Sequence, residues 1–143
     1  MGDERRRHVH VLVKNPQDYS VLVASNMFGD IISDLCAQLV GGLGFAASAN
    51  LGDDYAIFEP THGSAPKYAG LYLVNPIAML ISTRLILEYL GEHERAARLE
   101  RGIERTIAGG RVLTYDMERR PADPERDRGR TLEVAEEVVR NMD

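Results

Sequence analysis

The segment from Asn75 to Gly91 constrains the fold more than any other part of this sequence. It opens with Asn-Pro, and asparagine is a favoured helix N-cap while proline is favoured at the first helical position. The residues that follow, to about Leu90, are apolar on most sides of a helix, and a glycine then ends the pattern. A helix that is apolar on most sides must be covered by other elements. We therefore predict a central core helix here.

Three further helices are indicated by capping residues and terminating glycines. Their expected extents are Asn26 to the Gly41-Gly42 pair, Glu92 to Ile107 before Gly109-Gly110, and Thr131 to Met142. Ser25 or Asn26 is expected to cap the first, and Thr131 the last, because their side-chain oxygens accept from free backbone N–H groups. The second is the most charged, so we expect it at the surface.

Two short apolar runs are predicted to be strands, and a third is ambiguous. Tyr19 to Ala24 has the composition of a buried strand, and Asp54 to Glu59 resembles it. Val9 to Lys14 alternates weakly and fits a short strand or a helix end. No element is assigned to the Gly/Ala/Ser stretch up to Asn50. Arg119 to Arg130 is rich in proline and charge and is predicted to be a linker with nothing apolar to pack.

The alternation of strands and helices indicates the α/β class. At 143 residues the chain is long enough to bury a core. However, two or three strands are few for a doubly wound sheet, which usually has about 5–6. We therefore expect residues 1–143 to be part of a larger domain.

Composition excludes several classes of function. The net charge is −5, and no basic stripe with interleaved aromatics appears, which argues against nucleic-acid binding. No apolar run approaches the roughly 20 residues that a membrane span needs, and the first residues lack the apolar centre of a signal peptide. Cys36 is the single cysteine, expected to be a buried small hydrophobe. We expect a cytoplasmic protein.

Two carboxylates four residues apart are the first candidate site. Asp30 and Asp34 share one face near the start of a predicted helix. The apolar residues around them are expected to be buried: Ile31, Ile32, Leu35, Cys36, Leu39 and Val40. Both acids would then point from the edge of a core, and paired oxygen donors suit Mg²⁺ or Mn²⁺. Spacing alone also fits an ordinary solvated helix start.

The loop from Glu59 to Gly70 is the second candidate site. Its small residues allow close approach of a ligand, and Gly63 permits backbone conformations closed to other residues. Lys67 and Tyr68 offer a point charge and a flat polar ring to a phosphate, and a histidine precedes them. Neither a Rossmann fingerprint nor a P-loop is present. By spacing alone, a surface turn between a strand and a helix is the better interpretation.

Several motifs in order resemble the C-terminal part of the isocitrate/isopropylmalate dehydrogenase family of β-decarboxylating dehydrogenases. They are Asn26-Met-Phe-Gly-Asp-Ile-Ile-Ser-Asp34, Val40-Gly-Gly-Leu-Gly44, Ala49-Asn-Leu-Gly52, Glu59-Pro-Thr-His-Gly-Ser-Ala-Pro-Lys-Tyr-Ala-Gly70 and Val74-Asn-Pro76. The resemblance runs from about Leu12 to the C-terminus. It implies a partial large domain of the isopropylmalate dehydrogenase-like fold.

The resemblance also implies cofactors and site residues. Asp30 and Asp34 would ligate Mg²⁺ or Mn²⁺, which in turn chelates a 2-hydroxy acid. Seven loop residues, together with Asn75 at the adenine, would bind the dinucleotide; the loop residues are His62, Gly63, Ser64, Ala65, Pro66, Lys67 and Tyr68. The pair Lys67-Tyr68 is typical of NADP-dependent isocitrate dehydrogenases, whereas NAD-dependent members tend to have Asp-Ile. Thr114-Tyr-Asp-Met-Glu-Arg119 resembles the segment whose tyrosine and arginine, here Tyr115 and Arg119, close over the 2′-phosphate. We therefore expect NADP, and isocitrate above isopropylmalate.

Departures from the family pattern limit this expectation. A third metal-binding aspartate falls at Arg6 when counted back from Leu12-Val-Lys-Asn-Pro16, so that ligand is missing. The substrate arginines and the catalytic tyrosine and lysine belong to regions with no counterpart here, so no catalytic residue is assigned and the chain alone is expected to be inactive. We expect a homo-oligomer or association with the missing half. The alternatives are a non-catalytic dinucleotide-binding or subunit-interaction module, or a fragment acting on isopropylmalate, homoisocitrate or tartrate.

Overall fold

The computed structural model describes residues 9–143, which divide into two compact units, one ending at Val40 and the other spanning Gly41–Asp143. The expectation for Arg6 lies outside the described residues, and the assignment of residues 1–143 to one larger domain stays a prediction. Among the described residues, no helix combines the length and apolar character that crossing a bilayer requires.

The first unit consists of short helices around a poorly covered apolar surface. Residues 9–14 are helical, which resolves the ambiguity of that segment, and η1 (Pro16–Asp18) and α2 (Asn26–Leu39) follow. Ser25 is the N-cap of α2 by position, and its carbonyl accepts from Gly29 N–H at 2.7 Å. Ala37 is the buried residue of this helix, whereas Ile31 is 61% exposed. The expected burial of the α2 face is therefore wrong for this unit, and Cys36 is half-buried.

The strand predicted at Tyr19 to Ala24 is absent. The segment has extended backbone at Tyr19 and at Ser25, but no strand of the described chain pairs with it. Val21 is 80% and Val23 is 95% exposed. A strand exists only through hydrogen bonds to a neighbouring strand. The composition of these residues indicated a strand propensity, but no strand among the described residues pairs with the segment.

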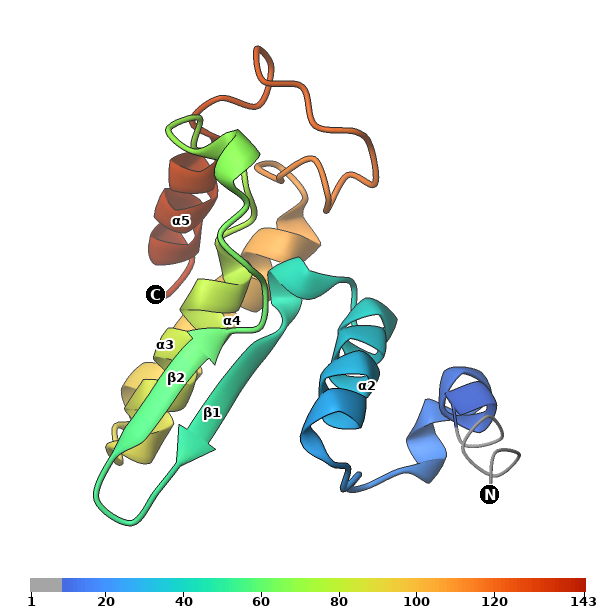
Figure 1. Ribbon diagram of the computed structural model, residues 1–143. Helices are drawn as coiled ribbons and strands as arrows, with labels where there is room; N and C mark the ends of the chain where they lie inside the picture. The colour runs from blue at the N-terminus through green and yellow to red at the C-terminus, as the bar shows by residue number, and fades with distance from the viewer. Residues whose placement is uncertain (1–8) are drawn as a thin grey trace. The chain divides into compact units, whose positions relative to one another are not determined.

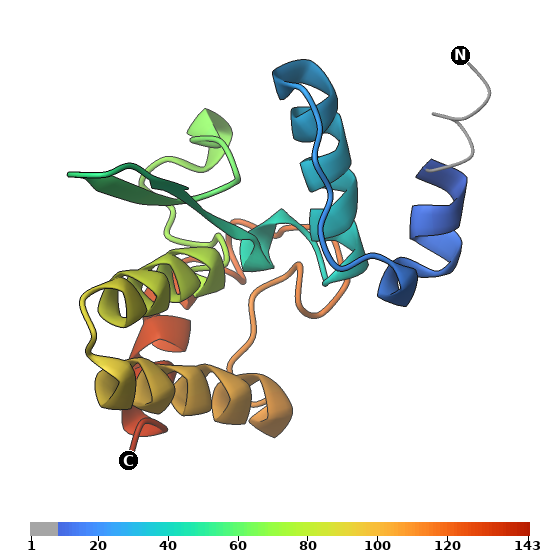
Figure 2. The ribbon, with the colours of Figure 1, turned by 90° about the horizontal axis from the view of Figure 1, so that it is seen from below.

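The elements of the second unit are η2 (Leu43–Phe45), β1 (Ala47–Leu51), β2 (Ala56–Pro60), η3 (Pro66–Tyr68), α3 (Ile77–Tyr89), α4 (His93–Gly109) and α5 (Arg130–Arg140). In this unit a hairpin lies against α3, and α4 and α5 lie beyond α3 (Figures 1 and 2). The strands are antiparallel, with Ala47 opposite Pro60 and Leu51 opposite Ala56. β2 confirms the strand expected near Asp54 to Glu59. β1 corrects the reading of the Gly/Ala/Ser stretch, because its partner strand, rather than its own composition, makes it a strand.

The core of the second unit lies between the three helices. The α3 residue Ile77 packs with Leu99 and Ile103 of α4 and with Val134 and Val138 of α5. α3 contacts both strands on its other side, which confirms it as the central helix. The α/β class is confirmed as well, in a helix-rich form with a small sheet.

The N-terminus of α5 and the segment before it differ from expectation. Gly129, rather than Thr131, is the N-cap of α5. Thr131 instead docks the helix onto the segment that precedes α3: its N–H donates to Tyr72 O at 2.8 Å and its hydroxyl to Val74 O at 2.5 Å. A long-range contact has therefore replaced the local cap that this residue type predicted.

Candidate cofactor and metal sites

The loop between β2 and α3 has a strained backbone at its centre. Ala65 has φ +44°, in the left-handed region that side chains other than glycine rarely adopt. The conformation turns the chain into η3, where Tyr68 N–H donates to Ala65 O at 2.9 Å. Strained residues cluster at ligand sites, where the surrounding structure supports them. The Ala65 conformation is therefore a structural sign of function that spacing alone did not supply.

The side chains of this loop are mostly presented to solvent. Gly63, Ser64, Pro66 and Lys67 are exposed, and His62 is half-buried. The His62 ring Nδ1 lies 2.9 Å from Gly63 O, which requires a proton on Nδ1. In a neutral ring Nε2 is then left as an acceptor. The loop therefore offers one oriented imidazole and an open backbone to a ligand.

Lys67, Tyr68 and Tyr115 are brought together from two distant segments. The Lys67 ammonium lies 4.6 Å from the Tyr68 ring centroid, within cation–π range. The Tyr68 and Tyr115 rings are tilted by 54° with centroids 6.2 Å apart. Burial, followed by the neighbouring Tyr68 and Asp116, raises the pKa of Tyr115. Its phenol is therefore a neutral hydrogen-bond donor at physiological pH.

Asn75 occupies the base of this region and is tied at both ends of its amide. Its Oδ1 accepts from Ile77 N–H at 2.9 Å, so the side-chain oxygen caps the first turn of α3 as expected, although Pro76 rather than Asn75 is the N-cap by position. Its Nδ2 donates to Asp116 Oδ2 at 2.9 Å, and the other carboxylate oxygen of Asp116 accepts from the Thr114 hydroxyl at 2.6 Å. Asn75 is 7% exposed, so any ligand meets only a small part of it.

Gly44 closes over the Asn75–Asp116 hydrogen bond. A Cβ at this position would lie 2.7 Å from Asn75 Nδ2 and 2.9 Å from Asp116 Oδ2, closer than any carbon can approach without displacing them. The glycine is therefore required by contact rather than by its backbone angle. Its place in the Val-Gly-Gly-Leu-Gly motif thus has a physical reason at this site.

The segment that carries Tyr115 and Arg119 is a series of turns. Glu118 N–H donates to Thr114 O, Arg119 N–H to Asp116 O and Arg120 N–H to Tyr115 O, at 3.0–3.1 Å. Arg119 has φ +54° and an exposed side chain. The structure thus makes this a folded turn, with the Arg119 side chain at the surface.

The predicted linker from Arg119 to Arg130 joins α4 to α5 without a helix or strand before Arg130, but a buried ion pair that the sequence did not indicate holds it in place. Arg120 Nη1 and Nη2 bond the two carboxylate oxygens of the fully buried Asp127 at 2.8 and 2.5 Å. Asp123 N–H also donates to Asp127 at 2.8 Å. The guanidinium holds the pKa of Asp127 well below its usual range. Buried charge, rather than apolar content, organises the segment, so a search for apolar side chains could not find it.

Asp30 and Asp34 lie on α2 in the first unit, and both are exposed. Within residues 9–143, no group of three or more His, Cys, Asp or Glu side chains gathers in a metal-binding arrangement. Two exposed carboxylates one turn apart nevertheless fit a hard divalent cation, which accepts oxygen ligands and keeps several waters. These two residues would hold such an ion from one side, and it would supply Lewis-acid polarisation to an oxygen ligand bound to it.

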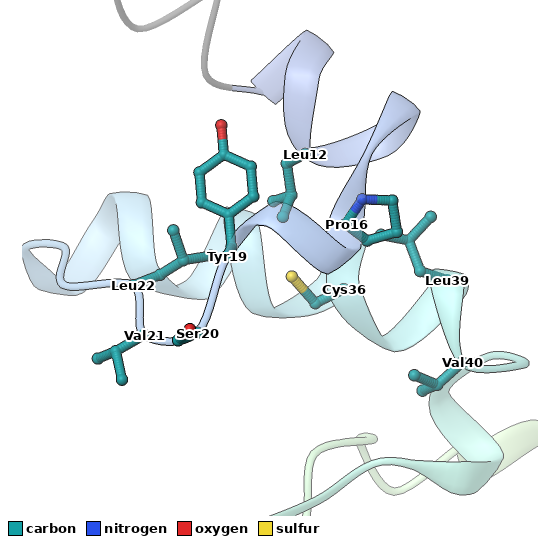
Figure 3. A pocket seen from close by; sticks show the side chains of 9 residues that line it. All are labelled: Leu12, Pro16, Tyr19, Ser20, Val21, Leu22, Cys36, Leu39 and Val40. Atoms are coloured by element: carbon teal, nitrogen blue, oxygen red, sulfur yellow. The ribbon is translucent and has the colours of Figure 1, made fainter.

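An apolar hollow of about 250 Å³ is also found in the first unit (Figure 3). Its lining residues are Leu12, Pro16, Tyr19, Ser20, Val21, Leu22, Cys36, Leu39 and Val40. In the close view the Cys36 thiol points from α2 towards Leu12 and the preceding segment. The lining lacks charged groups, so this hollow is separate in character from the aspartate pair.

Comparison with known proteins defines the class to which these features belong. The family model for isocitrate/isopropylmalate dehydrogenase matches residues 7–138. An isocitrate dehydrogenase [NADP] of Thermus thermophilus is 48% identical over 134 residues, which are 93% of this chain and 26% of that protein. A 3-isopropylmalate dehydrogenase of Methanothermobacter thermautotrophicus is 41% identical over 92% of this chain and 37% of its own.

Solved structures agree with the sequence matches. A crystal structure of a Thermus thermophilus protein matches with a TM-score of 0.87 at 45% identity, covering 96% of this chain and 27% of that one. Isocitrate dehydrogenase from Methylococcus capsulatus matches with a TM-score of 0.81 at 41% identity, covering 93% and 38%. The chain therefore belongs to the isocitrate/isopropylmalate dehydrogenase family, a family of metal- and NAD(P)-dependent oxidoreductases. It spans between about a quarter and two fifths of the length of these relatives.

Proposed function

We propose that this chain supplies the NADP-binding wall and two metal ligands of an isocitrate dehydrogenase, which oxidises isocitrate and releases CO₂ to leave 2-oxoglutarate while a hydride passes to NADP⁺. The observation that carries the proposal is the grouping of Lys67, Tyr68 and Tyr115. One ammonium and two phenols suit the extra dianionic phosphate that distinguishes NADP from NAD. Arg119, exposed on the same turn segment as Tyr115, adds a second cation that can fork onto phosphate oxygens.

The other site residues have defined roles in this proposal. The backbone of the loop from His62 to Pro66 wraps the adenosine, and Asn75 meets the adenine with its remaining amide hydrogen and lone pair. Asp30 and Asp34 hold Mg²⁺ or Mn²⁺, to which the hydroxy acid is bound. We assign no catalytic residue among them and expect no turnover by the chain alone.

The cofactor part is tested by calorimetry with NADP⁺ and NAD⁺ on the purified chain. We expect the unsubstituted chain to prefer NADP⁺, and the double variant K67D/Y68I to lose that preference, because an aspartate repels the 2′-phosphate. The matched control R101D reverses an exposed charge on α4, in another part of the same unit. Equal affinities for both dinucleotides in the unsubstituted chain would overturn the assignment of NADP.

The substrate part is tested by ligand-dependent Mn²⁺ binding. Isocitrate, 3-isopropylmalate and homoisocitrate each add chelating oxygens to a metal held by the aspartate pair, and we expect isocitrate to raise Mn²⁺ affinity most. The 3-isopropylmalate dehydrogenase similarity makes that acid the second candidate. A larger effect of 3-isopropylmalate would make that acid the first candidate substrate and isocitrate the second.

Association is the expected state of this chain, as a homo-oligomer or with the remainder of the family's fold. Val21 and Val23 are 80% and 95% exposed, and Met27 is 64% exposed, all within the first unit. Exposed apolar patches of this kind favour association. Light scattering at micromolar concentration tests it, and a monomer would contradict it. The cytoplasmic location stays a prediction.

A further inference from the structure

Asp116 is one of the residues of the Thr114-Tyr-Asp-Met-Glu-Arg119 segment to which the proposed function gives no role. It does not present its carboxylate to the loop around Lys67. One oxygen accepts from Asn75 Nδ2 at 2.9 Å and the other accepts from the Thr114 hydroxyl at 2.6 Å. Thr114 is fully buried and Asn75 nearly so. A charged side chain with both oxygens turned onto buried partners has a positional task.

Asp116 determines how the Asn75 amide is oriented. An amide has a donor end and an acceptor end, and only the network around it decides which way they face. The α3 N-terminus takes the acceptor end through Ile77 N–H, and the carboxylate takes the donor end. One amide hydrogen and one lone pair are left, which is the pairing that an adenine edge uses.

The same hydrogen bond joins two walls of the candidate cofactor site. Asn75 lies two residues before the start of α3, on the chain that leads from the loop containing Lys67 and Tyr68, while Asp116 lies next to Tyr115. Two backbone hydrogen bonds then stabilise the turn: Arg119 N–H donates to Asp116 O, and Arg120 N–H donates to Tyr115 O. Gly44 lies against the Asn75–Asp116 hydrogen bond and leaves no space for these two side chains to shift towards it.

We propose that Asp116 is a positioning residue that sets the discrimination between NADP and NAD, by fixing the Tyr115–Arg119 turn against Asn75 at the start of α3. The inference rests on the proposed function. Only NADP has the 2′-phosphate that this turn would meet, whereas both dinucleotides share the adenine that Asn75 would meet. Displacement of the turn therefore weakens NADP⁺ binding more than NAD⁺ binding.

Two substitutions separate position from charge. D116A removes both bonds and frees the turn. D116N removes the charge but keeps both bonds, because its Oδ1 still accepts from Asn75 Nδ2 while its NH₂ donates to the Thr114 hydroxyl, which also accepts. A positioning role is therefore retained by asparagine and lost with alanine. An electrostatic role of the carboxylate is lost with both.

The test is calorimetry of NADP⁺ and NAD⁺ on the full chain, with circular dichroism to establish folding. We expect D116A to reduce the ratio of NADP⁺ to NAD⁺ affinity by at least about fivefold, as expected when charge-assisted hydrogen bonds are removed. D116N should keep the ratio within about threefold. T114V removes only the hydrogen bond between Thr114 and Asp116 and should lower the ratio by a smaller factor in the same direction. If D116A does not fold, T114V tests the positioning role in its place.

The outcomes distinguish this inference from the function on which it rests. If the unsubstituted chain binds neither dinucleotide, the proposed function fails and the inference fails with it. If it prefers NADP⁺ while folded D116A or T114V keeps the same ratio, only the inference fails. A general structural role would lower both affinities and the melting temperature together and leave the ratio unchanged, which also overturns it. Loss of the ratio in D116N would assign the effect to charge, against the proposal.

Discussion

Arg120 bonds both carboxylate oxygens of Asp127 with two guanidinium nitrogens, and Asp127 has no exposed surface. Paired, planar geometry of this kind is the strongest form of side-chain ion pair. This ion pair ties together the segment between α4 and α5, and the same segment contains the Tyr115–Arg119 turn. The order of one wall of the candidate cofactor site therefore depends on a buried charge pair rather than on apolar packing.

We predict that D127N lowers the melting temperature at pH 7 by roughly 5 °C or more, because removing this charge leaves the part-buried Arg120 guanidinium with Glu118 as its remaining ionic partner. E125Q removes a carboxylate from an exposed residue of the same segment and should change it little. Thermal unfolding followed by circular dichroism checks both variants. Equal melting temperatures for D127N and the unsubstituted chain would show that the pair contributes nothing to stability.

The same pair predicts a pH dependence. The pKa of Asp127 is depressed in the folded chain, while an unfolded aspartate has a pKa of about 3.9. Both states are ionised at neutral pH, so the contribution is fully present there and above about pH 4–5. It is lost as the pH falls further, when the unfolded carboxyl takes up its proton first. The stability gap between the unsubstituted chain and D127N should therefore be constant from pH 8 to about 5 and shrink in more acidic solution.

The helices could be predicted from sequence because their signals are local. The asparagine and proline before α3 and the glycines after α2 and α4 act within one turn of the elements they bound, and those elements are present. Two of the failures concern partners distant in sequence. Thr131 is an ordinary cap residue whose hydroxyl is instead used by Val74 O. Ala47–Leu51 has little strand propensity of its own and becomes β1 opposite β2.

The candidate site divides in the same way. Family motifs indicated the residues that would face a ligand, such as Lys67 and Tyr115. They did not indicate Asp116, Arg120 or Asp127, whose roles are contacts between segments. A Thr-Tyr-Asp turn followed by an arginine gives no local sign that the aspartate faces inward. The sequence held one sign of these contacts, which was Gly44 in the Val-Gly-Gly-Leu-Gly motif. A glycine there indicates a close neighbour, but the sequence does not identify which residue that neighbour is.

Gly44 gives a prediction for the site itself. G44A places a methyl group 2.7 Å from Asn75 Nδ2, so the Asn75–Asp116 bond must move. We expect a loss of about 1–3 kcal/mol in unfolding free energy, typical of overpacking, together with weaker NADP⁺ binding. G109A is the matched control, because nothing lies within 4 Å of its added Cβ and it sits at the end of α4. It should be neutral or stabilise by up to about 1 kcal/mol. Denaturant titration measures both, and similar values for the two variants would contradict the close contact.

Tyr115 gives a prediction about its hydroxyl. Y115F keeps the ring against Tyr68 and removes only the phenolic donor, so we expect NADP⁺ affinity to fall by about tenfold while NAD⁺ affinity changes little. Y55F, which alters an 84% exposed tyrosine on the hairpin, is the control. Because burial raises the pKa of Tyr115, the neutral donor persists through about pH 10 and is lost only as the pH rises beyond it. The difference between Y115F and the unsubstituted chain should therefore stay constant from pH 7 to 9, and a decline within that range would contradict the pKa direction.

The aspartate pair leads to a prediction of weak metal binding. Asp30 and Asp34 are exposed and supply two of the six positions that Mg²⁺ or Mn²⁺ prefers, with water in the others. We expect Mn²⁺ to bind the chain with a dissociation constant on the order of millimolar, as for weak carboxylate sites. D30N or D34N should lower the affinity by about tenfold, since one charge and one ligand are lost. D18N alters an exposed aspartate of the same unit and should change nothing. Paramagnetic resonance of free Mn²⁺ counts the bound fraction directly. Binding that persists in a D30N/D34N double variant would locate the ion elsewhere and remove the pair from the site.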